Sequence, residues 1–141
     1  MTTPLAALLG FALWTLAVLI FTVGVHRWSL ILIGRAGIHQ FPADAPAGPD
    51  WYRRAVRAHA NCIENLPVFA SIVGVATASG AKGAALDALA LAVLGARVGQ
   101  TVAHVAFPQT RRVVSVRFSF FCVQLMAMLA MAAIVACASA R

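Results

Sequence analysis

The sequence predicts an all-α integral membrane protein, a bundle of four transmembrane helices in a single domain over residues 1–141. Of the 141 residues, 62% are hydrophobic and only 11% are charged, whereas a soluble domain has about 25% charged residues. Three apolar stretches are long enough to cross a bilayer, which takes about 20 residues. A fourth reaches that length when its polar first part, residues 57–64, is counted. Four spans use most of the 141 residues, so the chain has no room for a second domain.

The net charge of +7 does not indicate nucleic acid as a partner. The basic residues cluster at the ends of the apolar spans and do not form a surface run interleaved with aromatic residues. The expected surroundings are membrane lipid. Cys62, Cys122 and Cys137 lie in apolar stretches without CxxC spacing, and no two histidines are four residues apart. We therefore expect packing roles for the cysteines and no metal site.

The first helix is predicted over residues 5–33, with no charge before His26 and Arg27. Gly34 and Gly37 mark its end. Residues 34–50 form a surface loop, because Pro42, Pro46 and Pro49 exclude a regular helix or strand. Asp50 is the expected N-cap of the next helix.

Three more helices follow, over residues 51–79, 84–107 and 113–138. Pro67 lies inside the second helix, where it removes a backbone hydrogen bond and is expected to bend the helix. A glycine turn at residues 80–83 precedes the third helix, which stops at Pro108. The fourth begins between Arg111 and Val114, and Arg117 is the one charged residue near its start.

The basic residues are distributed unequally between the two membrane sides. Eight arginines lie near the first and third connections, whereas the second connection has Lys82 and the C-terminus has Arg141. Because short cytoplasmic loops carry an excess of Lys and Arg, we expect the 34–50 loop to be cytoplasmic. Both termini are then on the outside.

Polar residues of the second and third helices fall on single helix faces. Arg57, Asn61 and Glu64 have i, i+4 and i+7 spacing, with Arg54 one turn earlier, and the third helix has a similar stripe of Arg97, Gln100, Thr101 and His104. An ionisable group at membrane depth costs roughly 2.5–3.5 kcal/mol even on the lenient insertion scale. Both stripes should therefore face protein, and we expect a polar cavity in the cytoplasmic half of the bundle.

Such a cavity suits an anionic ligand that forms hydrogen bonds. Arginines bind carboxylates through two parallel hydrogen bonds. Asn61 offers a donor and an acceptor, and Glu64 can accept from an ammonium group. An arginine beside a thiol favours the nucleophilic thiolate, so tripeptide thiol chemistry is physically possible here.

The second helix carries the pattern Arg54-x-x-Arg57-Ala58-His59-x-Asn61-x-x-Glu64-x-x-Pro67-x-Phe69. This pattern resembles the second-helix signature of the MAPEG family, the membrane-associated proteins in eicosanoid and glutathione metabolism. The helix count, the proline-rich first loop and Ala96-Arg97 on the third helix agree with the same family. The resemblance therefore covers nearly the whole chain.

The resemblance implies a homotrimer of four-helix bundles, with glutathione as co-substrate between neighbouring subunits and a lipophilic electrophile entering from the membrane. Carried over residue by residue, Arg57, Asn61 and Glu64 would hold the glutathione backbone, and Arg54 matches a further arginine of the family. We expect Arg97, Gln100 and His104 of the third-helix stripe to complete the glutathione site. Arg111, three residues after Pro108, matches the family's thiolate-stabilising arginine. Arg112 is its competitor, because the loop length there varies.

The chain also departs from the family pattern on the third helix. Members that conjugate glutathione commonly carry tyrosines where this chain has Gln100 and His104. Gln and His retain hydrogen bonding but lose the ring contact. Ala60 replaces a basic residue of the prostaglandin-forming members, which disfavours that activity.

The resulting hypothesis is a bacterial-type glutathione transferase or peroxidase of the inner membrane that acts on lipophilic electrophiles. One alternative is a non-catalytic ligand-binding or structural protein of the same fold. In that case Arg57, Asn61 and Glu64 form a buried network, with Glu64 paired to Arg97 or Arg27. A small proton-coupled exporter that uses Glu64 is a third hypothesis, which the surplus of nearby arginines disfavours.

Overall fold

The computed structural model describes residues 1–42 and 46–139, and the described residues form helices and connections without a strand. Residues 43–45, which belong to the predicted first loop, and Arg141, which was counted among the basic residues near the C-terminus, lie outside these ranges. Four helices are long and apolar enough to cross a membrane: Thr3–Leu32, Asp50–Ala78, Ala84–Ala106 and Arg111–Ala138. The predicted bounds differ from these by at most two residues.

The first span is a continuous rod made of three segments, α1 (Thr3–Val18), η1 (Leu19–Gly24) and α2 (Val25–Leu32). The segment η1 is a π-helix, an irregularity that the sequence pattern did not predict. Because one turn is wider there, side chains after Gly24 are rotated relative to those of α1.

The second span, α3 (Asp50–Ala78), begins after a short 3₁₀ turn, η2 (Ile38–Gln40), and the rest of the loop. The prediction that Asp50 is the N-cap is wrong. Pro49 occupies that position with an extended backbone (φ −64°, ψ 155°), and Asp50 is the first helical residue. Its carboxylate still lies in the first turn, where the helix dipole favours a negative charge. The helix continues through Pro67.

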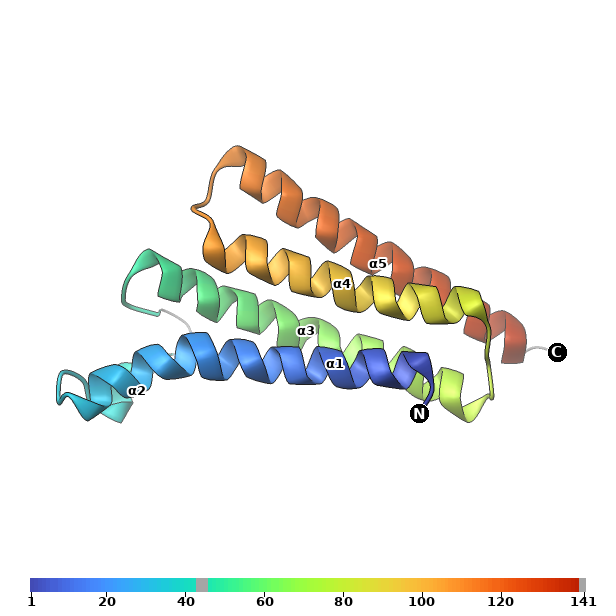
Figure 1. Ribbon diagram of the computed structural model, residues 1–141, viewed down its shortest axis with the longest axis horizontal. Helices are drawn as coiled ribbons and strands as arrows, with labels where there is room; N and C mark the ends of the chain where they lie inside the picture. The colour runs from blue at the N-terminus through green and yellow to red at the C-terminus, as the bar shows by residue number, and fades with distance from the viewer. Residues whose placement is uncertain (43–45, 140–141) are drawn as a thin grey trace.

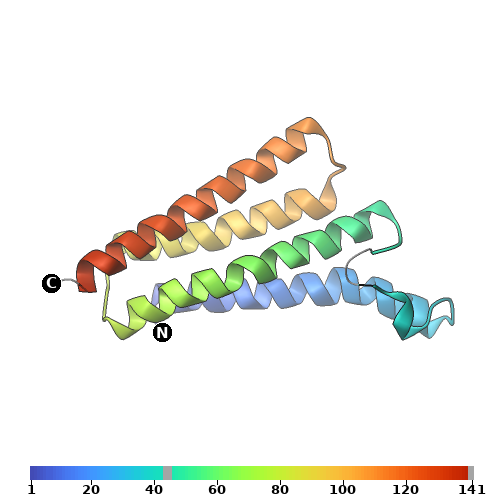
Figure 2. The same ribbon diagram turned by 180° about the vertical axis from the view of Figure 1, so that it is seen from behind.

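The remaining helices, α4 (Ala84–Ala106) and α5 (Arg111–Ser139), form an antiparallel pair. Figure 1 and Figure 2 show α4 between α5 and the pair formed by α1 and α3. The N-terminus, the turn between α3 and α4 and the C-terminal end of α5 lie at one end of the bundle. The described parts of the first loop and the connection from α4 to α5 lie at the other end, which we call the arginine end.

The hydrophobic core runs along the middle of the bundle. It is built from Phe11 of α1, Phe69 and Val73 of α3, Val93 of α4 and Met131 of α5, all fully buried. The Phe11 and Phe69 rings are in contact, with centroids 5.9 Å apart. This core continues to the end opposite the arginine end, so the polar residues of α3 and α4 gather near the arginine end.

Candidate functional site

Four arginines from two helices line one pocket at the arginine end. The pocket has a volume of about 610 Å³, within the range of small-molecule sites. It is formed where α3 and α5 begin and α4 ends, and its lining residues are Asp50, Arg53, Arg54, Arg57, His104, Pro108, Gln109 and Arg117. Four guanidinium groups face a single carboxylate, so the pocket attracts anions.

The first two turns of α3 supply three of these arginines. Arg53 forms an ion pair with Asp50 one turn earlier, and this is the one ion pair among the described residues. Arg54 donates from Nη2 to the Val105 carbonyl oxygen at 3.3 Å, while its Nε is buried without a hydrogen-bond partner. The contact holds the start of α3 against the end of α4. Arg57, one turn further on, is exposed.

His104 and Arg117 complete the pocket from the side of α4 and α5. His104 is buried in the last turn of α4. The Nε of Arg117 is buried without a hydrogen-bond partner. Sequence reasoning assigned no binding role to Arg53 or Arg117. For Arg117 a signal was available, because it lies more than a turn inside the fourth span and is therefore poorly placed as an anchor at the span end.

The polar stripe of α4 is buried along its whole length. Arg97, Gln100, Thr101 and His104 are all at least nine-tenths buried. Only His104 lines the pocket, because Arg97 and Gln100 lie deeper in the bundle. The Arg97 guanidinium lies 5.5 Å from the Phe11 ring centroid and close enough to the Cys62 thiol to interact with it. The carboxamide oxygen of Gln100 is buried without a partner.

The stripe of α3 points away from the interior of the single bundle. The core side of α3 includes Ala58, Cys62 and Phe69. On the other side of the helix, Arg57 and Glu64 are exposed and Asn61 is half-buried. Neither Asn61 nor Glu64 lines the pocket. Within the described ranges, Glu64 has no ion pair.

The suggested pairing of Glu64 with Arg97 or Arg27 therefore does not occur in the described part of the chain, and Arg27 has a different partner. Its Nε donates a 2.8 Å hydrogen bond to the Tyr52 hydroxyl oxygen. Its guanidinium also lies 5.4 Å from the Phe41 ring centroid. Arg27 thus holds the end of the first span and its loop against the start of α3.

Arg111 and Arg112 are the first two residues of α5, and both are exposed. Neither lines the pocket of the single chain. They lie at the arginine end, at a helix N-terminus whose dipole favours negative charge. The geometry does not distinguish between them as the thiolate-stabilising residue.

An apolar hollow of about 280 Å³ lies between the first span and the end of α4. Trp14, Phe21 and Thr22 line it from the first span, and Val102 and Val105 line it from α4. Its lining reaches the last turn of α4, which also carries His104. An apolar surface and an arginine-lined pocket thus occur in the same half of the bundle.

Four apolar spans and a basic pocket at one end define the class: this chain is an integral membrane protein with a four-helix architecture. A comparison with protein families matches residues 4–137 to the MAPEG family. The chain therefore belongs to that family, which is associated with glutathione and includes transferases, peroxidases and non-catalytic members. A comparison with curated proteins found no match.

Proposed function

We propose that this protein is a membrane-bound glutathione transferase or peroxidase that acts on lipophilic electrophiles. The observation that carries the proposal is the convergence of Arg53, Arg54, Arg57 and Arg117 on one pocket, at the end of the bundle where the family's signature residues begin. Glutathione carries two carboxylates and one ammonium group. The arginines suit the carboxylates through charge-assisted hydrogen bonds, and Glu64 offers an acceptor for the ammonium group.

The exposed stripe of α3 supports a homotrimer. A spanning helix that presents Arg57 and Glu64 outward is costly in lipid, where each such group loses several kcal/mol of hydration. A second copy of the chain packed on this face covers both groups. A glutathione site between subunits would then join the arginine pocket to Asn61 and Glu64, while Arg97 and Gln100 support it from inside the bundle.

In the proposed reaction, the arginines hold the glutathione carboxylates and so position the thiol near the start of α5. Arg111, or Arg112 in its place, stabilises the thiolate together with the dipole of the α5 N-terminus. The thiolate sulfur attacks the electrophilic carbon, forming a C–S bond while the displaced electron pair leaves with the leaving group. The apolar hollow beside α4 provides a surface for the lipophilic part of the electrophile.

The arrangement in the membrane follows from charge. The arginine end collects most basic residues, so we propose that it faces the cytoplasm of a bacterium and that both termini face outward. Glutathione would then reach the pocket from the compartment in which it is made.

A non-catalytic member of the family is the second candidate, and one observation favours it. Gln100 and His104 stand where conjugating members commonly have tyrosines, and Gln100 is buried outside the pocket. If the protein is such a non-catalytic member, it should bind glutathione without transferring it to an electrophile.

The test separates binding from catalysis. Thermal unfolding of the detergent-solubilised protein is measured against glutathione concentration, since a ligand at 100 times its dissociation constant stabilises by about 2.7 kcal/mol. Conjugation of chlorodinitrobenzene and reduction of a fatty-acid hydroperoxide are then assayed on the same sample. Stabilisation with turnover supports the enzyme, and stabilisation without turnover supports the binding protein. A protein that shows neither overturns both.

A trimer is tested separately by native mass spectrometry of the protein in detergent. Glu64→Gln is measured in parallel as a variant of the proposed contact face, because it removes the charge but keeps the size of the side chain. A monomer over the concentration range in which glutathione binds would contradict a site between subunits.

A further inference from the structure

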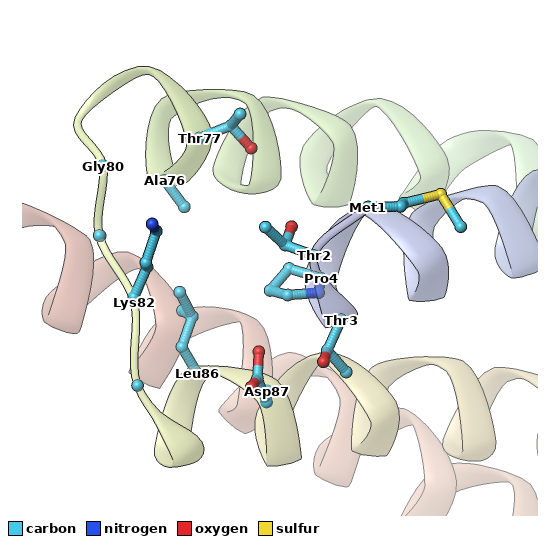
Figure 3. A pocket seen from close by; sticks show the side chains of 12 residues that line it. Met1, Thr2, Thr3, Pro4, Ala76, Thr77, Gly80, Lys82, Leu86 and Asp87 are labelled. Carbon is cyan, nitrogen blue, oxygen red and sulfur yellow. The ribbon is translucent and has the colours of Figure 1, made fainter.

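A second polar pocket lies at the end of the bundle opposite the arginine end. Its volume is about 370 Å³, and it is formed by the N-terminal residues, the end of α3, the turn at residues 80–83 and the first turn of α4. Figure 3 shows Asp87 on α4, Lys82 on the turn between α3 and α4, Thr77 on α3, and Thr2 and Pro4 on the N-terminal segment. Because four spans end here, the pocket lies at the membrane boundary.

The charges of this pocket distinguish it from the arginine pocket. Lys82 is the chain's one lysine, Asp87 is one of four acidic residues, and both line the same hollow. Within the described residues they form no ion pair with each other or with another group. Among its side chains, the pocket therefore offers one cation and one anion, each available to a ligand.

The turn fixes the position of Lys82. Gly80 adopts a left-handed conformation (φ 68°) after the last turn of α3. Its N–H donates to the Thr77 carbonyl oxygen at 3.2 Å, and the N–H of Ala81 donates to the Ala76 carbonyl oxygen at 3.0 Å. This pair of bonds closes the helix end in a Schellman motif. The backbone that carries Lys82 is thus held at the rim of the pocket.

Asp87 and the threonines supply the remaining polar groups. Asp87 is half-buried in the first turn of α4, where its N–H donates to the Gly83 carbonyl oxygen at 3.1 Å. The Thr77 hydroxyl donates to the Val73 carbonyl oxygen at 2.8 Å, so its oxygen remains an acceptor. The floor beneath these groups is apolar, because Ala76 and Leu86 are almost completely buried.

We propose that this pocket binds a phosphoethanolamine group, that is, a primary ammonium linked by a short carbon chain to a phosphodiester. The Asp87 carboxylate accepts hydrogen bonds from the ammonium group, and the Lys82 ammonium pairs with the phosphate. Phosphatidylethanolamine in the bilayer and a soluble glycerophosphodiester both carry this chemistry. The membrane-boundary position brings the lipid form directly to the pocket.

The test uses the full-length protein in nanodiscs of phosphatidylethanolamine, phosphatidylcholine or phosphatidylglycerol, each diluted to equal mole fraction in a neutral carrier lipid. Thermal unfolding should occur at the highest temperature with phosphatidylethanolamine. The other two lipids should stabilise less, because the quaternary ammonium of phosphatidylcholine cannot donate a hydrogen bond to Asp87 and the headgroup of phosphatidylglycerol has no cation. A parallel titration with glycerophosphoethanolamine in detergent measures the soluble form. Greater stabilisation by phosphatidylethanolamine than by the other two lipids identifies the lipid as the source of the ligand, and stabilisation by glycerophosphoethanolamine identifies the soluble form.

Two variants and one control make the test specific. Asp87→Asn should weaken the apparent affinity for phosphatidylethanolamine about tenfold and remove its advantage over phosphatidylglycerol. Asp87→Glu is the second variant, used in case Asp87→Asn folds poorly. It keeps the carboxylate and should therefore retain part of the advantage of phosphatidylethanolamine. The control Arg35→Gln removes an exposed charge at the arginine end and should change nothing. Equal stabilisation by all three lipids, or an unchanged preference in Asp87→Asn, overturns the proposal.

Discussion

The Nε of Arg27 donates a 2.8 Å hydrogen bond to the hydroxyl oxygen of Tyr52, the chain's one tyrosine. Tyr52 is 1% exposed, and its ring centroid lies 4.3 Å from that of His26. This contact joins the end of the first span to the first turn of α3, next to Arg53 and Arg54 of the arginine pocket. The position of the pocket arginines therefore depends on packing between the first two spans.

Tyr52→Phe should destabilise the protein by about 1–2 kcal/mol. The substitution keeps the ring but leaves the Arg27 Nε without its acceptor in a partly buried position. Thermal or denaturant unfolding in detergent measures the effect. Trp51→Phe is the matched control, because Trp51 is the more exposed neighbour. Equal stability of Tyr52→Phe and the wild type would show that the hydrogen bond contributes little.

Arg57→Ala and Arg117→Ala should each weaken glutathione binding by about tenfold or more. Each variant removes a guanidinium from the pocket, and a hydrogen bond to a charged group contributes about 1.5–3 kcal/mol. Isothermal titration calorimetry gives the dissociation constants. Arg35→Ala serves as the control for loss of positive charge outside the pocket. If all three variants bind equally well, glutathione is not held by these arginines.

Arg111→Ala should lower the conjugation rate at neutral pH by about tenfold to a hundredfold, with little effect on glutathione affinity. The proposed role of Arg111 is to stabilise the thiolate, so its loss should move the pH–rate profile toward higher pH. Arg111→Lys should recover part of the rate because it keeps the charge. Arg112→Ala is made in parallel, and the variant that moves the profile identifies the functional arginine.

Gly99→Ala should destabilise the α4–α5 pair relative to Gly95→Ala. A methyl group on Gly99 would lie 2.7 Å from Cζ of Phe120, whereas one on Gly95 has open space within 4 Å. Overpacking costs typically 1–3 kcal/mol. Rotation of the Phe120 ring away from the new methyl group would lower this cost. Replacing Gly by Ala inside a helix is otherwise favourable by up to about 1 kcal/mol.

Unfolding free energies of both glycine variants are compared in the wild-type background and again with Phe120→Ala. The difference between the two sites should disappear once the ring is removed. A difference that persists without Phe120 would mean that contact with this ring is not its cause.

The four spans could be predicted from the sequence because the property that defines them is local. A helix of about twenty apolar residues spans the hydrocarbon core of the bilayer whatever its neighbours are. Prolines and glycines mark the connections between the spans. Two local details were not predicted, namely the π-helical segment Leu19–Gly24 and the N-cap at Pro49. Neither could be predicted, because the local sequence at each position is compatible with more than one backbone geometry.

The candidate site could be predicted only in part. Spacing showed that Arg57, Asn61 and Glu64 share one helix face, but spacing does not determine which way that face points. The structure turns it outward and buries the stripe of α4 instead. It also brings Arg117 to Arg57 across 60 positions of sequence, since both line one pocket.

The sequence by itself therefore determined the membrane class, the number of spans and the family signature, because hydropathy and motif spacing are properties of short segments. Only the tertiary structure decided which arginines share a pocket and which polar groups are buried without partners. The physical reason is that the rotation of each helix about its own axis is set by packing against its neighbours, and a helix pattern leaves that rotation undetermined.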